Sequence, residues 1–214
     1  TEVPGATIYT NPDAGYMFYG LSLEKLYDSA NPSTPYFFNT SKTTNMWSMF
    51  SNIRLSSTGI PFDCTNGNGV SPFGLMDTSS VVNMINIFSG CKNVDFTGIE
   101  NWDMHKVTDI SSMFNRLGNI CKIPWDIGNW EFDNLQNVED CFLIGEWSTD
   151  VDYKVNMTKW DLSHCDASKL FNEYEYKYNT ISRLGVGPKL VDKNGKAFFP
   201  TTKQPIGIAN SSQH

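Results

Sequence analysis

The sequence predicts an α/β solenoid of about five strand-turn-helix units between an N-terminal cap and a small C-terminal β cap. The main observation is an internal repeat. A 13-residue block starts at residues 38, 76, 102 and 130, and a copy one residue shorter starts at residue 160. In the first four copies a large apolar residue opens the block and a phenylalanine closes it. Fixed blocks joined by segments of unequal length are typical of stacked repeats, which accept insertions between units.

The second observation is the spacing of apolar residues inside each block. In the third copy these residues are Val107, Ile110, Met113 and Phe114. Steps of three, three and one place them on one face of a helix, and Thr78, Ser79 or Asp133 occupies the N-cap position in other copies. The segments 93–99 and 120–125 have strand character. One such unit cannot bury its apolar face alone, whereas stacked units can, with their strands in a parallel ladder.

Two groups of equivalent positions recur through the blocks. The aromatic positions are Trp102, Trp130, Trp160, Phe50, Phe88, Phe114 and Phe142. The acidic positions, one residue after the opening one, are Asp77, Asp103, Glu131 and Asp161. Because repeated equivalents usually serve the fold, we interpret the tryptophans as core residues rather than a sugar-stacking platform. We interpret the carboxylates as acceptors for backbone N–H groups. The alternative is a glycan-active enzyme that uses these repeat-face carboxylates as a catalytic pair.

The third block, Trp-Asp-Met-His-Lys-Val-Thr-Asp-Ile-Ser-Ser-Met-Phe at residues 102–114, resembles the BspA-like leucine-rich-repeat family of bacterial surface proteins. Residues 77–84 and the Ser-Gly-Cys at 89–91 are also similar to the family's pattern. The resemblance covers about residues 38–172. It implies a leucine-rich-repeat-like solenoid associated with cell-surface display, adhesion and protein binding, and related repeats occur in phage-encoded proteins. The resemblance brings no catalytic residues.

The chain divides into three parts on this evidence. Residues 1–37, rich in Tyr, Phe, Pro and Gly, form an N-terminal cap or, alternatively, an arm that docks on a neighbouring subunit. Residues 38–172 form the repeat solenoid. Residues 173–214 form a β-hairpin cap and a C-terminal tail, because Asn194-Gly195 between apolar segments is a strong hairpin signal. The solenoid ends require such caps to cover an apolar face.

Candidate binding residues lie outside the repeat columns. Tyr174, Tyr176 and Tyr178 alternate as on one face of a strand, where they contact a partner or glycan, or pack on the last repeat. Trp147 and Tyr153 lie between the fourth and fifth blocks.

The remaining composition excludes several classes of function. The formal charge of −7, without a basic patch, argues against a nucleic-acid surface, and no apolar run is long enough for a membrane helix. The five cysteines form no C-x-x-C pair, so we expect reduced thiols that pack as small hydrophobes. Of the three histidines, His105 and His164 fall at polar positions of the blocks, and neither lies near another obvious ligand in sequence. We therefore expect no metal, no cofactor and no enzymatic activity.

These observations predict a binding or structural protein that presents a rigid surface to another protein or a glycan. Its partners are other subunits of an assembly, or a host-surface protein or glycan, without nucleic acid and without membrane insertion. The first residues, Thr-Glu-Val-Pro-Gly, lack the basic and apolar regions of a signal peptide. The predicted setting is a phage virion, as a structural or decoration component, or a bacterial cell surface, as an adhesin.

Overall fold

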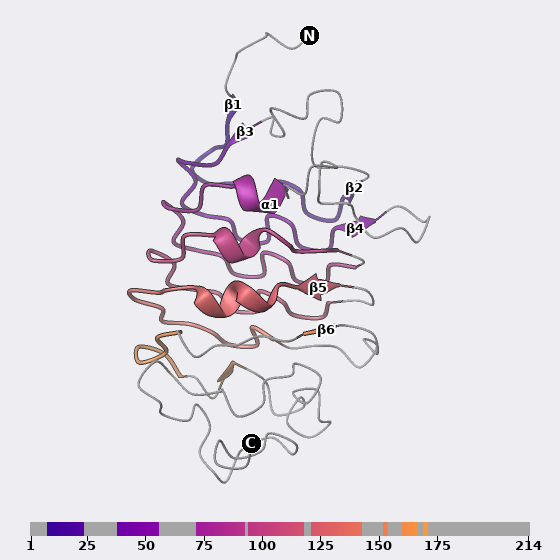
Figure 1. The fold of residues 1–214 in the computed structure, drawn as a ribbon. Coiled ribbons are helices and arrows are strands. Elements are labelled where there is room, and N and C mark those ends of the chain that lie inside the picture. The colour runs from indigo at the N-terminus through magenta and orange to yellow at the C-terminus, as the bar shows by residue number, and fades with distance from the viewer. Residues whose placement is uncertain are drawn as a thin grey trace.

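The computed structural model describes residues 8–23, 38–55, 72–92, 94–117, 121–142, 152–153, 160–166 and 169–170. Within them the chain passes repeatedly across the molecule, and each pass, here called a winding, lies beside the next (Figure 1). The windings follow one another in sequence order from the N-terminal strands downward in that view.

The regular elements are short and pair in parallel between windings. Strand β1 (Ile8–Tyr9) pairs with β3 (Phe38–Asn39), and β2 (Ser22–Leu23) pairs with β4 (Arg54–Leu55). Strand β5 (Lys122–Ile123) pairs with β6 (Asp152–Tyr153). On another side of the stack lie the helix α1 (Pro72–Leu75) and the 3-10 helices η1 (Ile99–Asn101) and η2 (Trp125–Asn129), which contact one another in that order.

One column of residues shows the register of the windings. Single parallel bridges join, in succession, Asp13, Asn45, Asn83, Asp109 and Asn137. The last four are the eighth residues of the blocks that start at 38, 76, 102 and 130, so these blocks stack in register. Asp13 lies in the segment expected to be a cap or arm. Residues 8–23 therefore add a further winding, which the sequence alignment beginning at Phe38 missed.

The helix expected in the second half of each block is wrong for the described copies. Residues 47–52, 85–90 and 111–116 form consecutive turns instead. Each run has a left-handed residue at two positions four apart: Ser48 and Asn52, Asn86 and Gly90, Ser112 and Arg116. A left-handed residue interrupts the i→i−4 hydrogen bonds of an α-helix. The apolar residues predicted to share one helix face still share one side of the chain, because this turn run also brings every third or fourth side chain to the core.

Backbone hydrogen bonds explain why the turn run is favoured. The N–H groups of Met46, Ser48 and Phe50 donate to carbonyls of the following winding at 2.8–3.0 Å. The intervening N–H groups of Met49 and Ser51 donate within their own winding, three residues back. The same alternation recurs from Met84 onward and from Ile110 onward. Stacking thus satisfies the donors that a lone winding leaves open.

The core contains a ladder of phenylalanine rings. Phe18, Phe50, Phe88, Phe114 and Phe142 stack in succession, with ring centroids 5.3–5.9 Å apart. Beside them Cys141 takes the buried position held by Met49, Ile87 and Met113 in the other windings. The described cysteines, Cys91, Cys121, Cys141 and Cys165, are free thiols. Burial raises the pKa of the Cys91 and Cys141 thiols well above the ordinary value, so both stay protonated.

Among the described residues, no helix combines the length and the apolar character needed to span a bilayer.

Candidate functional site

The acidic column of the repeat makes local turns. Oδ1 of Asp77, Asp103 and Asp161 each accepts a hydrogen bond from the backbone N–H two residues later, at 3.0–3.1 Å. Asn39 does the same for Ser41 at 2.8 Å. Such Asx turns let a short polar side chain replace a missing backbone acceptor. The column therefore closes the turn after the opening residue in the blocks that start at 38, 76, 102 and 160.

Hydrogen bonds from Ser79 hold the pKa of Asp77 below its ordinary value. The side-chain hydroxyl contributes more than the backbone N–H, and Lys106 adds a smaller attraction. A general acid for glycoside cleavage needs a raised pKa so that it carries a proton near neutral pH. Asp77 has the opposite shift, which suits a turn acceptor.

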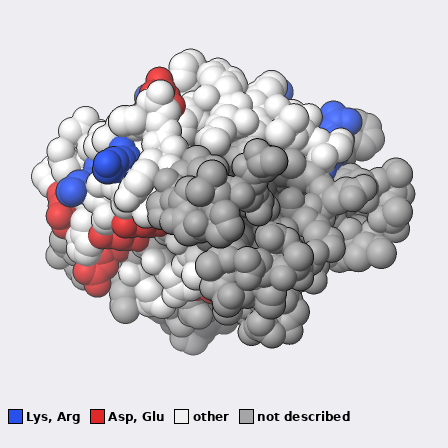
Figure 2. All heavy atoms as spheres, turned by 90° about the horizontal axis from the view of Figure 1, so that it is seen from above, with Lys and Arg blue, Asp and Glu red and all other residues white. Residues whose placement is uncertain are grey.

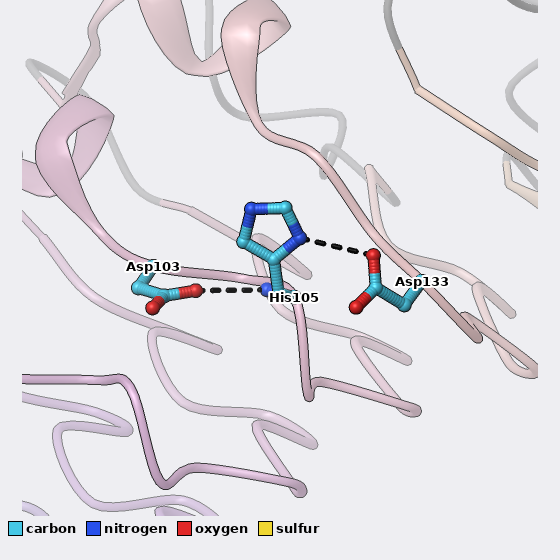
Figure 3. Close-up of polar contacts among 3 residues, drawn as sticks. All are labelled: Asp103, His105 and Asp133. Carbon is cyan, nitrogen blue, oxygen red and sulfur yellow. Dashed lines mark hydrogen bonds and ion pairs between the residues drawn. The ribbon is translucent and has the colours of Figure 1, made fainter.

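The fifth winding contributes a surface carboxylate from outside the acidic column, Asp133. His105 Nδ1 lies 3.0 Å from Asp133 Oδ1, while the His105 backbone N–H donates to Asp103 (Figure 3). The hydrogen bond to Asp133 raises the pKa of His105, and the nearby charges of Asp133, Asp103 and Glu131 act in the same direction. Both side chains are largely exposed, so this pair links two windings at the surface without enclosing a cavity.

The tryptophan column lies in the core. Trp102, Trp130 and Trp160 are at most 4% exposed. Their Nε1 groups donate to the carbonyls of Phe73, Ile99 and Ile127 at 2.7–2.9 Å. A buried indole with its donor already used has no face open to a sugar.

The predicted binding residues fall mostly outside the described part of the chain. Tyr174, Tyr176, Tyr178 and Trp147 lie outside the described residues. Tyr153 belongs to β6, where its backbone pairs with Ile123 of β5.

The structure reveals an exposed aromatic cluster that the sequence analysis missed. Tyr16 contacts Tyr19 and Trp47 edge to face, with ring centroids 5.3 and 5.1 Å apart. The three side chains are 41–48% exposed, and Met17 and Leu21 beside them are exposed to a similar extent. We call Tyr16, Tyr19 and Trp47 the aromatic cluster. It lies on the first two windings of the described stack.

The cluster departs from the repeat. Tyr16 occupies the left-handed position held elsewhere by Ser48, Asn86, Ser112 and Asp140. The positions equivalent to Tyr19, three residues further on, carry Ser51, Ser89 and Asn115. The described equivalents in the other windings are therefore small polar residues, where the first winding has large aromatic ones. This contrast was the available sequence signal, but it needs residues 8–23 to be aligned as a winding.

Charged side chains also lie on the surface of the described residues. In the view from above the N-terminal windings, Asp and Glu side chains gather at the left margin with a few Lys or Arg beside them (Figure 2). One described cation, Lys42, lies over the ring of Tyr9 at 4.5 Å from its centroid. The described residues contain no group of three or more His, Cys, Asp or Glu side chains arranged to hold a metal ion.

The family of the chain follows from a match that covers most of the repeat blocks. Residues 59–183 match the model of a family described as Mycoplasma protein of unknown function, DUF285. The chain belongs to this family. The DUF285 match contains the blocks that start at 76, 102, 130 and 160, whereas the block at 38 and the aromatic cluster precede it. No curated protein and no solved structure matches the chain.

Proposed function

We propose that this DUF285 protein is a non-enzymatic binding protein, a solenoid of BspA-like leucine-rich-repeat windings that presents a rigid surface to a protein or a glycan. The observation that carries the proposal is the aromatic cluster. Exposed tyrosine and tryptophan side chains supply a large contact area at low entropic cost, and such residues are enriched at binding hot spots. The two tyrosines stand where the next two windings have serine or asparagine, and Trp47 stands where the adjacent windings have Gly15 and Ile85.

The stack supports this role by holding the cluster in place. The backbone of Tyr16 is bonded in both directions: its N–H donates to the Trp47 carbonyl at 3.0 Å, and its carbonyl accepts from Tyr19 at 3.1 Å. All three rings of the cluster therefore come from one hydrogen-bonded pair of windings. A surface that is already ordered loses little conformational entropy when it binds.

The proposed setting is a phage virion, where the protein is a structural or decoration component, or a bacterial cell surface, where it is an adhesin. In either setting the partner is a subunit of the assembly or a host-surface protein or glycan. Mass spectrometry of purified virions and of peptides released from the surface of intact cells distinguishes the two settings.

The binding proposal is tested by replacing the cluster with the residues of other windings. The variant Tyr16→Ser/Tyr19→Ser/Trp47→Ser keeps a side chain that the left-handed position already accepts at Ser48. The matched control is Tyr9→Ser, which removes an exposed aromatic ring that packs against Lys42 rather than in the cluster. Both variants and the parent are applied to glycan arrays and to protein extracts of the setting identified by mass spectrometry.

We expect the triple variant to lose binding at least tenfold while Tyr9→Ser binds as the parent does. Circular dichroism melting shows whether each variant is folded. Equal binding by all three folded proteins contradicts the proposed role of the cluster.

A further inference from the structure

The first winding ends the described stack with a row of open backbone acceptors. In the inner windings the carbonyls of residues such as Asn45, Trp47 and Met49 accept N–H groups from the winding before them. The equivalent acceptors of the first winding are the carbonyls of Asp13, Gly15, Met17 and Tyr19. None of these four accepts a hydrogen bond from another described residue.

The donors of the same segment are all used. From residue 13 to residue 21 every backbone N–H donates, either to the second winding, to a carbonyl three residues back, or to the side chain of Asn11 or Asp13. Residue 12 is proline and has no N–H, whereas the equivalent residue of the second winding, Thr44, donates to the Pro12 carbonyl. The edge over residues 13–20 therefore presents acceptors alone.

An acceptor-only edge restricts what binds to it. Two copies of this chain cannot pair symmetrically through it, because carbonyl would face carbonyl. A partner that bonds to this edge in place of water must bring a row of N–H donors. A polypeptide backbone supplies such a row, and adding a segment to an open edge is a known mode of peptide recognition.

The spacing of the acceptors specifies the conformation of that segment. The left-handed residues Tyr16 and Gly20 make the edge follow the turn run of the repeat rather than a straight strand. A backbone of matching shape contacts this kind of edge at each junction inside the stack, where Ala14, Met46, Met84 and Ile110 begin the donor rows. We propose that the open edge of the first winding receives one winding of the same repeat type from a second polypeptide chain.

The aromatic cluster adjoins this edge and adds contact area to it. Tyr16, Met17 and Tyr19 lie on the segment that carries the acceptors, and each is nearly half exposed. The inference rests on the proposed function, which it deepens by assigning the partner as polypeptide. The backbone acceptors align the bound segment with the edge, and the exposed apolar side chains supply surface that is buried on binding.

The experiment uses the intact chain and a synthetic peptide of residues 108–117, which forms a donor row in the stack. The N–H groups of Ile110, Ser112 and Phe114 donate to the next winding there, at 2.8–3.0 Å. Binding of the fluorescently labelled peptide is followed by anisotropy. An edge peptide has ester bonds in place of the amides of Ser112 and Phe114, which removes two donors that face the open edge.

The matched control peptide has esters at Met113 and Asn115, whose N–H groups donate within their own winding. It loses the same number of donors but none that faces the edge. We expect saturable binding of the parent peptide at one site per chain, a loss of at least tenfold for the edge peptide, and a clearly smaller loss for the control peptide.

Equal losses for the two ester peptides, or no binding of the parent peptide, overturn the inference. If the protein binds a glycan through the aromatic cluster and ignores the parent peptide, the proposed function stands and the polypeptide partner is wrong. If the cluster variant of the preceding section binds every ligand as the parent protein does, the proposed function fails as well. The two failures are thus distinguishable.

Discussion

The indole of Trp160 lies nearly parallel to that of Trp130, with ring centroids 5.7 Å apart and an interplanar angle of 14°. Each Nε1 donates to a backbone carbonyl one winding earlier, Trp130 to Ile99 and Trp160 to Ile127, both at 2.9 Å. The Trp160 side chain therefore packs against Trp130, the equivalent residue of the preceding winding, and also donates a hydrogen bond to that winding. This double contact couples the windings to one another.

Trp130→Phe tests that coupling. The change keeps a ring in the stack but removes the hydrogen bond to Ile99, which we expect to cost about 1 kcal/mol, with a further contribution from the smaller ring. Denaturant unfolding followed by circular dichroism measures the loss. Trp47→Phe, at an exposed ring, is the control and is expected to stay within about 0.5 kcal/mol of the parent. Equal stability of Trp130→Phe and the parent contradicts the structural role of the indole donor.

Asn83 belongs to the set of asparagine and aspartate residues whose backbones form the parallel bridges between windings. Its Oδ1 accepts the Ile85 N–H at 2.9 Å, whereas the carbonyl three residues back, that of Val82, accepts from the backbone N–H of Thr108. We expect Asn83→Ala to lower the free energy of unfolding by about 1 kcal/mol, as for loss of a helix N-cap. Asn83→Asp retains the acceptor that Asp109 supplies in the next winding, so it should preserve most of the stability. Thermal unfolding of the two variants compares them, and an equal loss for both would show that the amide group, not Oδ1, matters.

Gly90 is confined by two independent constraints. It has φ of +71°, and a Cβ atom at this position would lie 2.2 Å from Oδ1 of Asn52 in the preceding winding. We expect Gly90→Ala to destabilise the fold by about 2 kcal/mol or more, from left-handed strain and from the displaced Asn52 side chain.

A double-mutant cycle separates the two constraints at Gly90. In an Asn52→Gly background only the backbone strain remains, so Gly90→Ala should cost about 1 kcal/mol. If the cost of Gly90→Ala is the same in both backgrounds, the contact with Asn52 is not a constraint.

The pair of His105 and Asp133 gives a pH dependence with a definite sign. The pKa of His105 is raised in the folded protein, chiefly by the hydrogen bond to Asp133. The protonated form is thus favoured by folding, so the stabilisation is fully present below the unfolded pKa and is lost as pH rises through the folded pKa. Because both groups are exposed, salt weakens the interaction.

Titration of the His105 ring by NMR measures this shift. We expect Asp133→Asn to return the pKa of His105 toward its ordinary value, while Asp161→Asn, in a different winding, leaves it unchanged. His105→Gln assigns the resonance. If the pKa of His105 is the same in the parent and in Asp133→Asn, the contact between His105 and Asp133 is contradicted.

Sequence alone determined the repeat from Phe38 onward and the residues of each block that face the core. Phe50, Phe88, Phe114 and Phe142 were identified by spacing, and they form one ladder because equivalent positions in register must meet. The acceptor role of Asp103 also followed from its residue type, since a short carboxylate beside a turn bonds to nearby backbone N–H groups.

Tertiary structure decided the backbone conformation of the block and the place of the exposed aromatic cluster. A period of three to four residues is shared by a helix and by the observed turn run, and only hydrogen bonds to the next winding favour left-handed residues such as Ser48 and Ser112. Likewise, Tyr16 and Trp47 are 31 residues apart in the chain. They meet because parallel stacking brings one winding onto the next, a contact between distant residues that local sequence preference does not encode.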